Sequence, residues 1–188
     1  MSEEYEYQPR LDSSDGVFVL SPPRSGSSCF TACVSLQGFN LGANPARVKD
    51  HLNEKGYFEN AQVLEFNATA LRQVDADVFS THPLTTEQMH QTLGSLVPLE
   101  DLIAAEFCVD GEIKPFVIKD PRLLLLEELY FNVLPDVKVI CLTRDRAAII
   151  ASLERGWRGK HAAFDKVVDN FLSMTADVAG RRRAHIVV

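Results

Sequence analysis

A loop rich in hydroxyl side chains follows the first apolar run of this 188-residue chain. The run Val17–Leu20 stops at Ser21-Pro22-Pro23, and the next five residues are Arg24, Ser25, Gly26, Ser27 and Ser28. Glycine lets a backbone approach an oxyanion closely, amides near a helix N-terminus point outward, and serine hydroxyls add donors around them. The segment therefore predicts a phosphate-binding loop, with an ordinary serine N-cap as the alternative.

Arg144 and Ser152 form a second candidate pair for binding a phosphate. Arg144 follows the apolar run Val137–Leu142, and Ser152 comes eight positions later, about two turns into the predicted helix that follows. Both side chains could thus reach one phosphate from different sides. The alternative is that Arg144 forms a surface ion pair and Ser152 is a solvated helix residue.

Two further basic residues, Lys119 and Arg122, flank Asp120-Pro121 at the end of a third apolar run, Phe116–Ile118. At a strand end they could face a transferred group or an acceptor, or form a salt bridge with Asp120. Trp157 is the only tryptophan, and it could stack on an adenine or fill the edge of the core.

Short, wholly apolar strands that alternate with helices predict the elements that would position these residues. Strands are expected at 17–20, 78–80, 116–118, 137–142 and 184–188, and helices at 27–37, 60–74, 85–107 with a break at Pro98, 123–134, 147–153 and 161–179. This pattern predicts an α/β fold: three α/β/α layers with a central parallel sheet and a P-loop-like strand-loop-helix. Ligands bind at the carboxyl ends of the strands in such sheets, where Arg24, Lys119 and Arg144 fall.

Composition predicts one domain over residues 16–188 after a flexible leader over residues 1–15. With 26 acidic and 19 basic residues, the net charge of −7 argues against broad binding to nucleic acid or to anionic membranes. The N-terminus lacks the pattern of a signal peptide and no apolar run approaches a bilayer span, so we expect a cytoplasmic protein. Cys29 and Cys33 are one helical turn apart, and we expect them in the core.

Taken together, these stretches resemble the sulfotransferases that use 3′-phosphoadenosine-5′-phosphosulfate (PAPS). Residues 17–28 look like the 5′-phosphosulfate loop of that family, and residues 137–153 look like its 3′-phosphate motif, in which a serine follows the arginine by eight residues. The stretches Asn53–Glu59 and Ile118–Arg122 are similar to segments of bacterial sulfotransferase-like proteins. The four stretches occur in the expected order.

The resemblance implies a PAPS donor held at its 5′ end by residues 24–28 and at its 3′ phosphate by Arg144 and Ser152. The implied reaction is transfer of a sulfuryl group to a hydroxyl or amine, with 3′-phosphoadenosine-5′-phosphate (PAP) as product and no metal. The acceptor is expected to be a small molecule, a glycan or a lipid. Arg24 and Lys119 would assist as cations near the transferred group.

A base must take the proton of the acceptor, and in the family it is a histidine or a glutamate located after the first helix. His51, Glu54 and Glu59 lie in that region, and we favour Glu59 because Tyr57-Phe58 could desolvate its carboxyl. His51 is second. The alternative for Glu59 is an acid in the first helical turn that complements the helix dipole.

Two alternatives to a sulfotransferase remain at the sequence level. A small-metabolite kinase would share a P-loop-type fold, although the first loop has no GxxxxGK[ST] pattern. A non-catalytic domain that binds PAP or another nucleotide would keep the loop without the acceptor site. Many sulfotransferases continue past the strand that resembles 184–188. The resemblance therefore leaves three alternatives: an unusually short member, a truncated domain whose site another fragment or a partner completes, or a degraded donor site.

Overall fold

The protein is built around a four-stranded parallel sheet in the order β6-β1-β7-β8. The structure, a computed structural model, describes residues 11–46, 53, 56–157, 163–182 and 184–187. The sheet strands are β1 (Gly16–Leu20), β6 (Phe116–Lys119), β7 (Lys138–Leu142) and β8 (His185–Val187). Two short antiparallel pairs accompany it: β2 (Pro45–Ala46) with β3 (Glu59–Asn60), and β4 (Cys108–Val109) with β5 (Glu112–Ile113).

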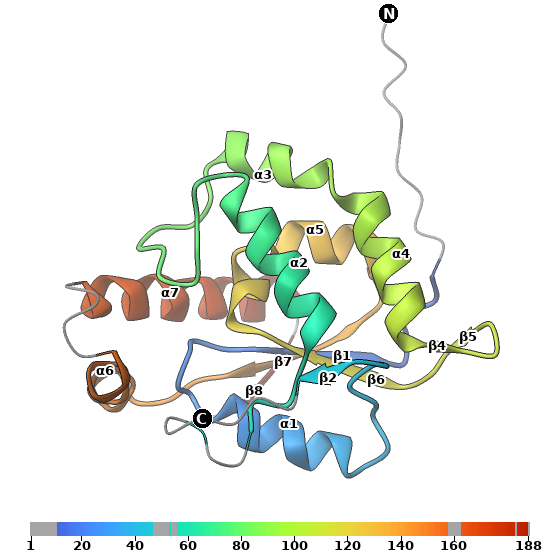
Figure 1. The fold of residues 1–188 in the computed structure, drawn as a ribbon. Coiled ribbons are helices and arrows are strands. Elements are labelled where there is room, and N and C mark those ends of the chain that lie inside the picture. Colours follow the sequence, from blue (N-terminus) through green and yellow to red (C-terminus); the bar gives the residue numbers. More distant parts are fainter. Residues whose placement is uncertain (1–10, 47–52, 54–55, 158–162, 183, 188) are drawn as a thin grey trace, which may run out of the picture.

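Helices cover both faces of this sheet, as Figure 1 shows. They are α1 (Ser27–Ser35), α2 (Ala61–Arg72), α3 (Thr86–Leu93), α4 (Leu96–Phe107), the 3₁₀ turn η1 (Pro121–Leu124), α5 (Glu127–Val133), α6 (Arg146–Gly156) and α7 (Phe164–Arg182). In the view of Figure 1, α1 lies below the sheet and α2, α4, α5 and α7 lie above it. The predicted α/β fold with a central parallel sheet and helices on both faces is confirmed.

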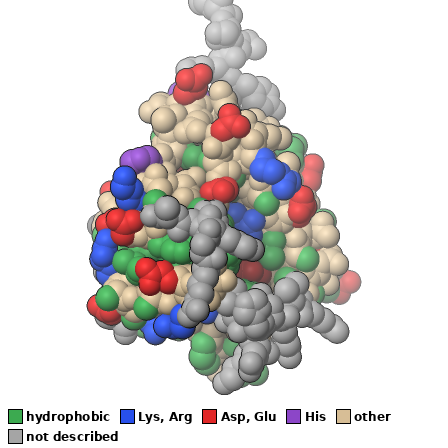
Figure 2. Space-filling model, turned by 60° about the vertical axis from the view of Figure 1, so that its left-hand side comes forward, with side chains coloured by type: hydrophobic (Ala, Val, Ile, Leu, Met, Phe, Trp, Pro, Cys, Tyr) green, Lys and Arg blue, Asp and Glu red, His purple; other side chains and the backbone are tan. Residues whose placement is uncertain are grey.

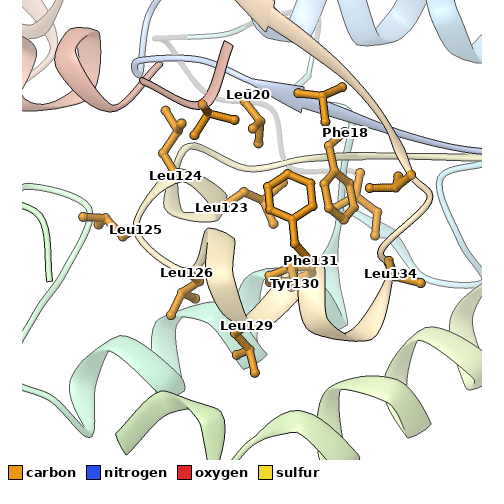
Figure 3. Packing of buried hydrophobic residues seen from close by; sticks show 14 of the residues in the cluster. Phe18, Leu20, Leu123, Leu124, Leu125, Leu126, Leu129, Tyr130, Phe131 and Leu134 are labelled. Atoms are coloured by element: carbon orange, nitrogen blue, oxygen red, sulfur yellow. The ribbon is translucent and has the colours of Figure 1, made fainter. Parts of the chain in front are cut away.

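Burial of β1 on both faces explains why its sequence is apolar throughout. Val17 and Val19 pack toward the side of α1, whereas Phe18 and Leu20 enter the larger core on the opposite face. Figure 3 shows Phe18 and Leu20 among the leucines and aromatic residues of η1 and α5. Because every side chain of β1 is buried, its backbone is held firmly where it leads into the loop at residues 22–26.

The structure corrects three of the predicted elements. Residues 78–80 form turns and bends instead of a strand, and Phe79 packs against Trp157 and Phe164. The predicted helix over 123–134 is divided into η1 and α5. The break within 85–107 falls at Gly94 and Ser95, while Pro98 lies in the first turn of α4, where its missing N–H would have no helical partner.

The prediction that Cys29 and Cys33 belong to the core is wrong, because both are exposed. Helix α1 instead buries Ser27 and Thr31, whose small side chains face the protein interior. Phe30 and Val34 lie on the same face and pack against the cluster of Val17 and Val19, so the apolar period of the helix holds for these two residues and fails for the cysteines.

Charged side chains of both signs are spread over the face of the molecule drawn in Figure 2, without a large patch of one sign. In the part of the chain that the structure describes, no helix combines the length and apolar character needed to cross a membrane.

Candidate functional site

A cleft of about 440 Å³ lies at the carboxyl ends of β1, β6 and β7. The chain leaves β1 toward α1 on one face of the sheet and leaves β6 toward η1 and α5 on the other. Connections that depart on opposite faces open a crevice at the strand ends, which is where parallel α/β sheets bind ligands. The volume of the cleft is within the range typical of small-molecule sites.

The loop after β1 presents the unblocked N-terminus of α1 to this cleft. Gly26 is the N-cap residue, its φ of 86° is left-handed, and no side chain caps the helix. A serine N-cap, the alternative considered from the sequence, is therefore not what the structure has. A Cβ at Gly26 would meet no atom within 4 Å, so open space remains where an anion could approach the amides.

Two other residues of this loop carry unusual features. Arg24 has a left-handed φ of 68°, which is uncommon for a residue with a side chain. Ser25 is buried, and its Oγ has no hydrogen-bond partner among the described residues. Buried polar atoms are nearly always paired, so an unpaired hydroxyl in this loop is consistent with a missing ligand or water.

The two predicted phosphate-binding segments meet because β1 and β7 are neighbours in the sheet. Arg24 Nε donates to Ser152 Oγ at 3.0 Å, and Arg144 Nη1 donates to the Arg24 carbonyl oxygen at 3.2 Å. Ser152 is buried, so it is not the solvated helix residue considered as an alternative. Three side chains that the sequence separates by up to 128 positions thus line one wall of the cleft.

Glu59 and Lys119 form a buried ion pair on another wall. Lys119, the last residue of β6, donates from Nζ to Glu59 Oε1 and lies 3.4 Å from Ser28 Oγ. The side chains are only 3% (Lys119) and 10% (Glu59) exposed, and both residues line the cleft. Glu59 precedes the N-cap Asn60 and so lies outside the first turn of α2, which excludes the helix-dipole alternative.

Burial raises the pKa of the Glu59 carboxyl above its ordinary value, while the ammonium of Lys119 acts in the opposite direction. Asp120 also raises this pKa and Arg122 lowers it. Glu59 therefore has the raised proton affinity of a candidate base. The ammonium of Lys119, which contacts it, keeps the pKa from rising further.

Arg122 lies in η1 and lines the cleft, and a buried network of polar side chains holds it in position. Its backbone N–H and its Nε both donate to Asp120 Oδ1 at 3.0 Å. Asn67 Nδ2 donates to Asp120 Oδ2 at 2.9 Å, and the Tyr130 hydroxyl donates to Asn67 Oδ1 at 2.7 Å. Burial raises the pKa of Tyr130 well above its usual value, so the hydroxyl stays a neutral donor. This network fixes the turn after β6 between Lys119 and Arg122.

An aromatic wall completes the cleft, formed by Tyr57, Phe79 and Trp157. The rings of Phe79 and Trp157 meet edge to face with centroids 5.8 Å apart. Trp157 thus packs against Phe79 at the edge of the core and also lines the cleft. Stacking on an adenine stays a prediction.

The segment that carries Glu59 is tied to α4 through Glu106. Asn60 caps α2 by accepting from the amides of Gln62 and Val63, and its Nδ2 donates to Glu106 Oε2 at 2.6 Å. Asn44 donates to both carboxylate oxygens of Glu106, at 2.9 and 2.7 Å. The position of Glu59 is therefore set in part by the bonds of its neighbour Asn60, and of Asn44, to α4.

Most of the residues predicted from the sequence line this cleft together. Those that do so are Arg24, Gly26, Ser27, Ser28, Glu59, Lys119, Arg144 and Ser152. Ser25 is buried within the loop, and His51 and Glu54 lie outside the described residues. Within the described ranges, no group of three or more His, Cys, Asp or Glu side chains gathers in a way that could hold a metal ion.

The sequence prediction missed the supporting residues Asn67, Tyr130 and Glu106. A signal existed for two of them, because Asn67 occupies the buried stripe of α2 with Val63 and Leu71, and Glu106 occupies that of α4. A polar residue at a position that the helical period assigns to the core predicts a buried hydrogen bond.

Comparison with known proteins gives a likeness in structure and none in sequence. No family model matches the chain, and no curated protein matches it. Among solved structures, the chain is similar to the sulfotransferase STF1 from Mycobacterium tuberculosis H37Rv, with 11% sequence identity and a TM-score of 0.49. The likeness covers 94% of this chain and 62% of that one, so the chain spans less than two thirds of the neighbour's length.

Proposed function

We propose that this protein is a PAPS-dependent sulfotransferase. The observation that carries the proposal is the hydrogen bond from Arg24 to Ser152, because it joins the two segments that resemble the 5′- and 3′-phosphate motifs of that family. Both phosphate-binding segments thus reach one cleft of suitable size. A nucleotide with phosphates at both ends matches this arrangement better than a single inorganic anion does.

The residues present fit such a donor. The open space at Gly26, the uncapped N-terminus of α1 and the unpaired hydroxyl of Ser25 suit a 5′ phosphosulfate. Arg144 and Ser152 would hold the 3′ phosphate, with Arg24 between the two ends.

The donor supplies an activated sulfuryl group: a new S–O or S–N bond forms to the acceptor, the bond from sulfur to the bridging oxygen breaks, and its electron pair leaves with PAP. The protein then has two tasks. Glu59 accepts the proton that the acceptor hydroxyl or amine gives up. Lys119 and Arg24 place positive charge where the leaving oxygen becomes negative. The acceptor, a small molecule, a glycan or a lipid, would enter beside Tyr57, Phe79 and Trp157.

Nucleotide binding and turnover test this proposal separately. Calorimetry should detect PAP binding without magnesium, and Glu59→Gln should abolish sulfuryl transfer from PAPS across an acceptor panel while retaining PAP binding. Glu65→Gln, which changes an exposed carboxylate on α2, is the matched control and should leave both unchanged.

Other outcomes would point to the alternatives. Binding of ATP that depends on magnesium, without binding of PAP, would replace the proposal with a kinase. Tight PAP binding without transfer to any acceptor would favour a non-catalytic nucleotide-binding domain. Unchanged turnover in Glu59→Gln would remove Glu59 as the base.

A further inference from the structure

Lys119 is shared between the candidate base and the candidate phosphosulfate loop. Its ammonium is paired with Glu59 Oε1 and lies 3.4 Å from the hydroxyl of Ser28, the second residue of α1. Its side chain is 3% exposed, so it has few other positions available. The ring of Tyr57, 5.9 Å from Nζ, further confines it. One buried cation therefore lies between an acid and an anion site.

The other charged groups around this pair do not replace Lys119. Asp120 and Arg122 act on Glu59 from the turn after β6, but Arg122 is bonded to Asp120. On the opposite wall, Arg24 is bonded to Ser152, and Arg144 donates to the backbone of the loop. Of these four cations, Lys119 is thus the one that is paired with the candidate base, Glu59.

We propose that donor binding moves the ammonium of Lys119 from Glu59 to the 5′ end of the donor, an inference that rests on the proposed function. Glu59 becomes an effective base only after this exchange. One hydrogen-bonded ion pair breaks and another forms, and no covalent bond changes. Before the donor arrives, the carboxylate is neutralised by Lys119. Once the donor is bound, the carboxylate is released at the moment when an acceptor can be used.

The exchange has a consequence for the proton equilibrium of Glu59. Burial already raises the pKa of this carboxyl, and Lys119 is the largest influence that lowers it. Loss of the ammonium and arrival of an anion both favour the protonated form, so the pKa rises further. Donor binding should then be accompanied by partial uptake of a proton, and the remaining carboxylate is a stronger base than before.

A double-mutant cycle on nucleotide affinity tests the exchange without using turnover. PAP is titrated calorimetrically into the wild-type protein, Glu59→Gln, Lys119→Met and the double variant. Removing Glu59 should tighten PAP binding in either background, because a negative charge disappears. Only where Lys119 is present does the change also end the competition for its ammonium.

The expected gain from Glu59→Gln is therefore about tenfold larger in the wild-type background than in the Lys119→Met background, a coupling of roughly 1.4 kcal/mol. Equal gains in the two backgrounds would overturn the proposal, since they would mean that Lys119 stays with Glu59 when the nucleotide binds. Glu65→Gln should leave PAP affinity unchanged.

A second measurement follows proton uptake directly and needs no double variant. PAP binding to the wild-type protein is measured at one pH in buffers of different ionisation enthalpy, which gives the number of protons taken up. The same titration of the Glu59→Gln variant gives the number of protons that the phosphates of PAP take up, and this number is the baseline. Greater uptake by the wild-type protein supports the exchange, and uptake equal to the baseline contradicts it.

If the Glu59→Gln variant does not fold, PAP binding to Lys119→Met supplies the comparison instead. Greater proton uptake by the wild type than by Lys119→Met supports the exchange, and equal uptake contradicts it. Failure of the proposed function is distinguishable from failure of the exchange. Without any PAP binding the proposed function itself fails, whereas PAP binding without coupling or proton uptake rejects only the exchange.

Discussion

Arg24 and Arg144 line the same wall of the cleft, but the side chain of Arg24 is held in place and that of Arg144 can adjust its position. Arg24 is anchored by its bond to Ser152 and by its left-handed backbone, so its position changes little with a ligand. Arg144 is exposed and donates to the Arg24 carbonyl at 3.2 Å, which brings its guanidinium to the rim of the cleft. Arginine presents five donors, and the bond to Arg24 engages only Nη1.

Replacing Arg144 should therefore remove recognition of the 3′ phosphate specifically. We expect Arg144→Ala to weaken PAP binding by about 10- to 100-fold, the range of a charge-assisted hydrogen bond, and to change the affinity for adenosine 5′-monophosphate little. Calorimetry with both nucleotides measures this. Arg146→Ala, two residues on and paired with Asp169, is the control; an equal loss for both nucleotides would contradict the assignment.

At the residue scale, the sequence predicted the cations and hydroxyls of the cleft but not their partners. Arg24, Ser152 and Lys119 could be named because each follows an apolar run or a fixed spacing. The salt bridge with Asp120 was one of the two alternatives, and Arg122 forms it two positions along the chain. The pairing of Lys119 with Glu59 depends on how β6 lies against β3, which no local pattern encodes.

At the scale of elements, the strand-loop-helix from β1 to α1 depends on its glycine. Ala at position 26 would be strained because φ is 86°, and its Cβ would occupy the open space in front of the amides. Gly38, after α1, has a φ of 97° and equally open surroundings, but it does not line the cleft. The two positions share the backbone cost and differ in their relation to the ligand.

We expect Gly26→Ala and Gly38→Ala each to lower the free energy of unfolding by about 1 kcal/mol. Only Gly26→Ala should also weaken PAP binding, by about tenfold or more. Urea unfolding and calorimetry of both variants give the comparison. Parallel losses of affinity would mean that strain alone, and not access to the amides, is responsible.

The connection between α4 and the segment before α2 predicts a pH-dependent stability. Burial disfavours the charged form of Glu106, but the hydrogen bonds from Asn60 and Asn44 outweigh this and lower the pKa of its carboxyl below 4.5. Such a group stabilises the fold above about pH 4.5, and the contribution is lost as the pH falls through the lowered pKa.

Glu106→Gln should accordingly lower the free energy of unfolding by about 3 kcal/mol at pH 7, because an amide group would face donors that a carboxylate accepts. The difference from the wild type should shrink below pH 4.5. Urea unfolding at several pH values tests this, with Glu65→Gln as the control. A difference that stays constant with pH would mean that packing, and not the charge, is lost.

The elements themselves were predictable where burial is complete. The strands β1, β6 and β7 follow from apolar runs, interrupted in β7 only by the exposed Lys138, and Asn60 was correctly placed at the start of its helix. Residues 78–80 resembled a strand because Val78 and Phe79 are apolar, yet these two residues form a turn, with Phe79 against Trp157 and Val78 against the main core. Strand propensity alone does not supply a hydrogen-bonding partner.

For the whole molecule, the cleft is a place where a negatively charged protein concentrates its positive charge. The chain carries a net charge of −7, yet Arg24, Lys119, Arg122 and Arg144 all line one cleft, where the described residues include two acidic side chains, Glu59 and Asp120. These residues come from the ends of β1, β6 and β7, so a bound anion would connect three strands and their helices. Binding should therefore stabilise the fold as a whole.

Thermal unfolding with and without nucleotide tests this last expectation. A ligand that binds only the folded state at 100 times its Kd adds about 2.7 kcal/mol, which for a domain of this length corresponds to about 5–10 °C in Tm. PAP should produce this shift without magnesium, and Arg144→Ala at the same PAP concentration should show about half of it or less, because a 10- to 100-fold lower affinity leaves the site less saturated. The wild-type shift should also decrease as salt is added, since the site acts through local charge. An equal shift in both proteins would place the nucleotide elsewhere, and a shift caused by ATP with magnesium but not by PAP would favour the kinase.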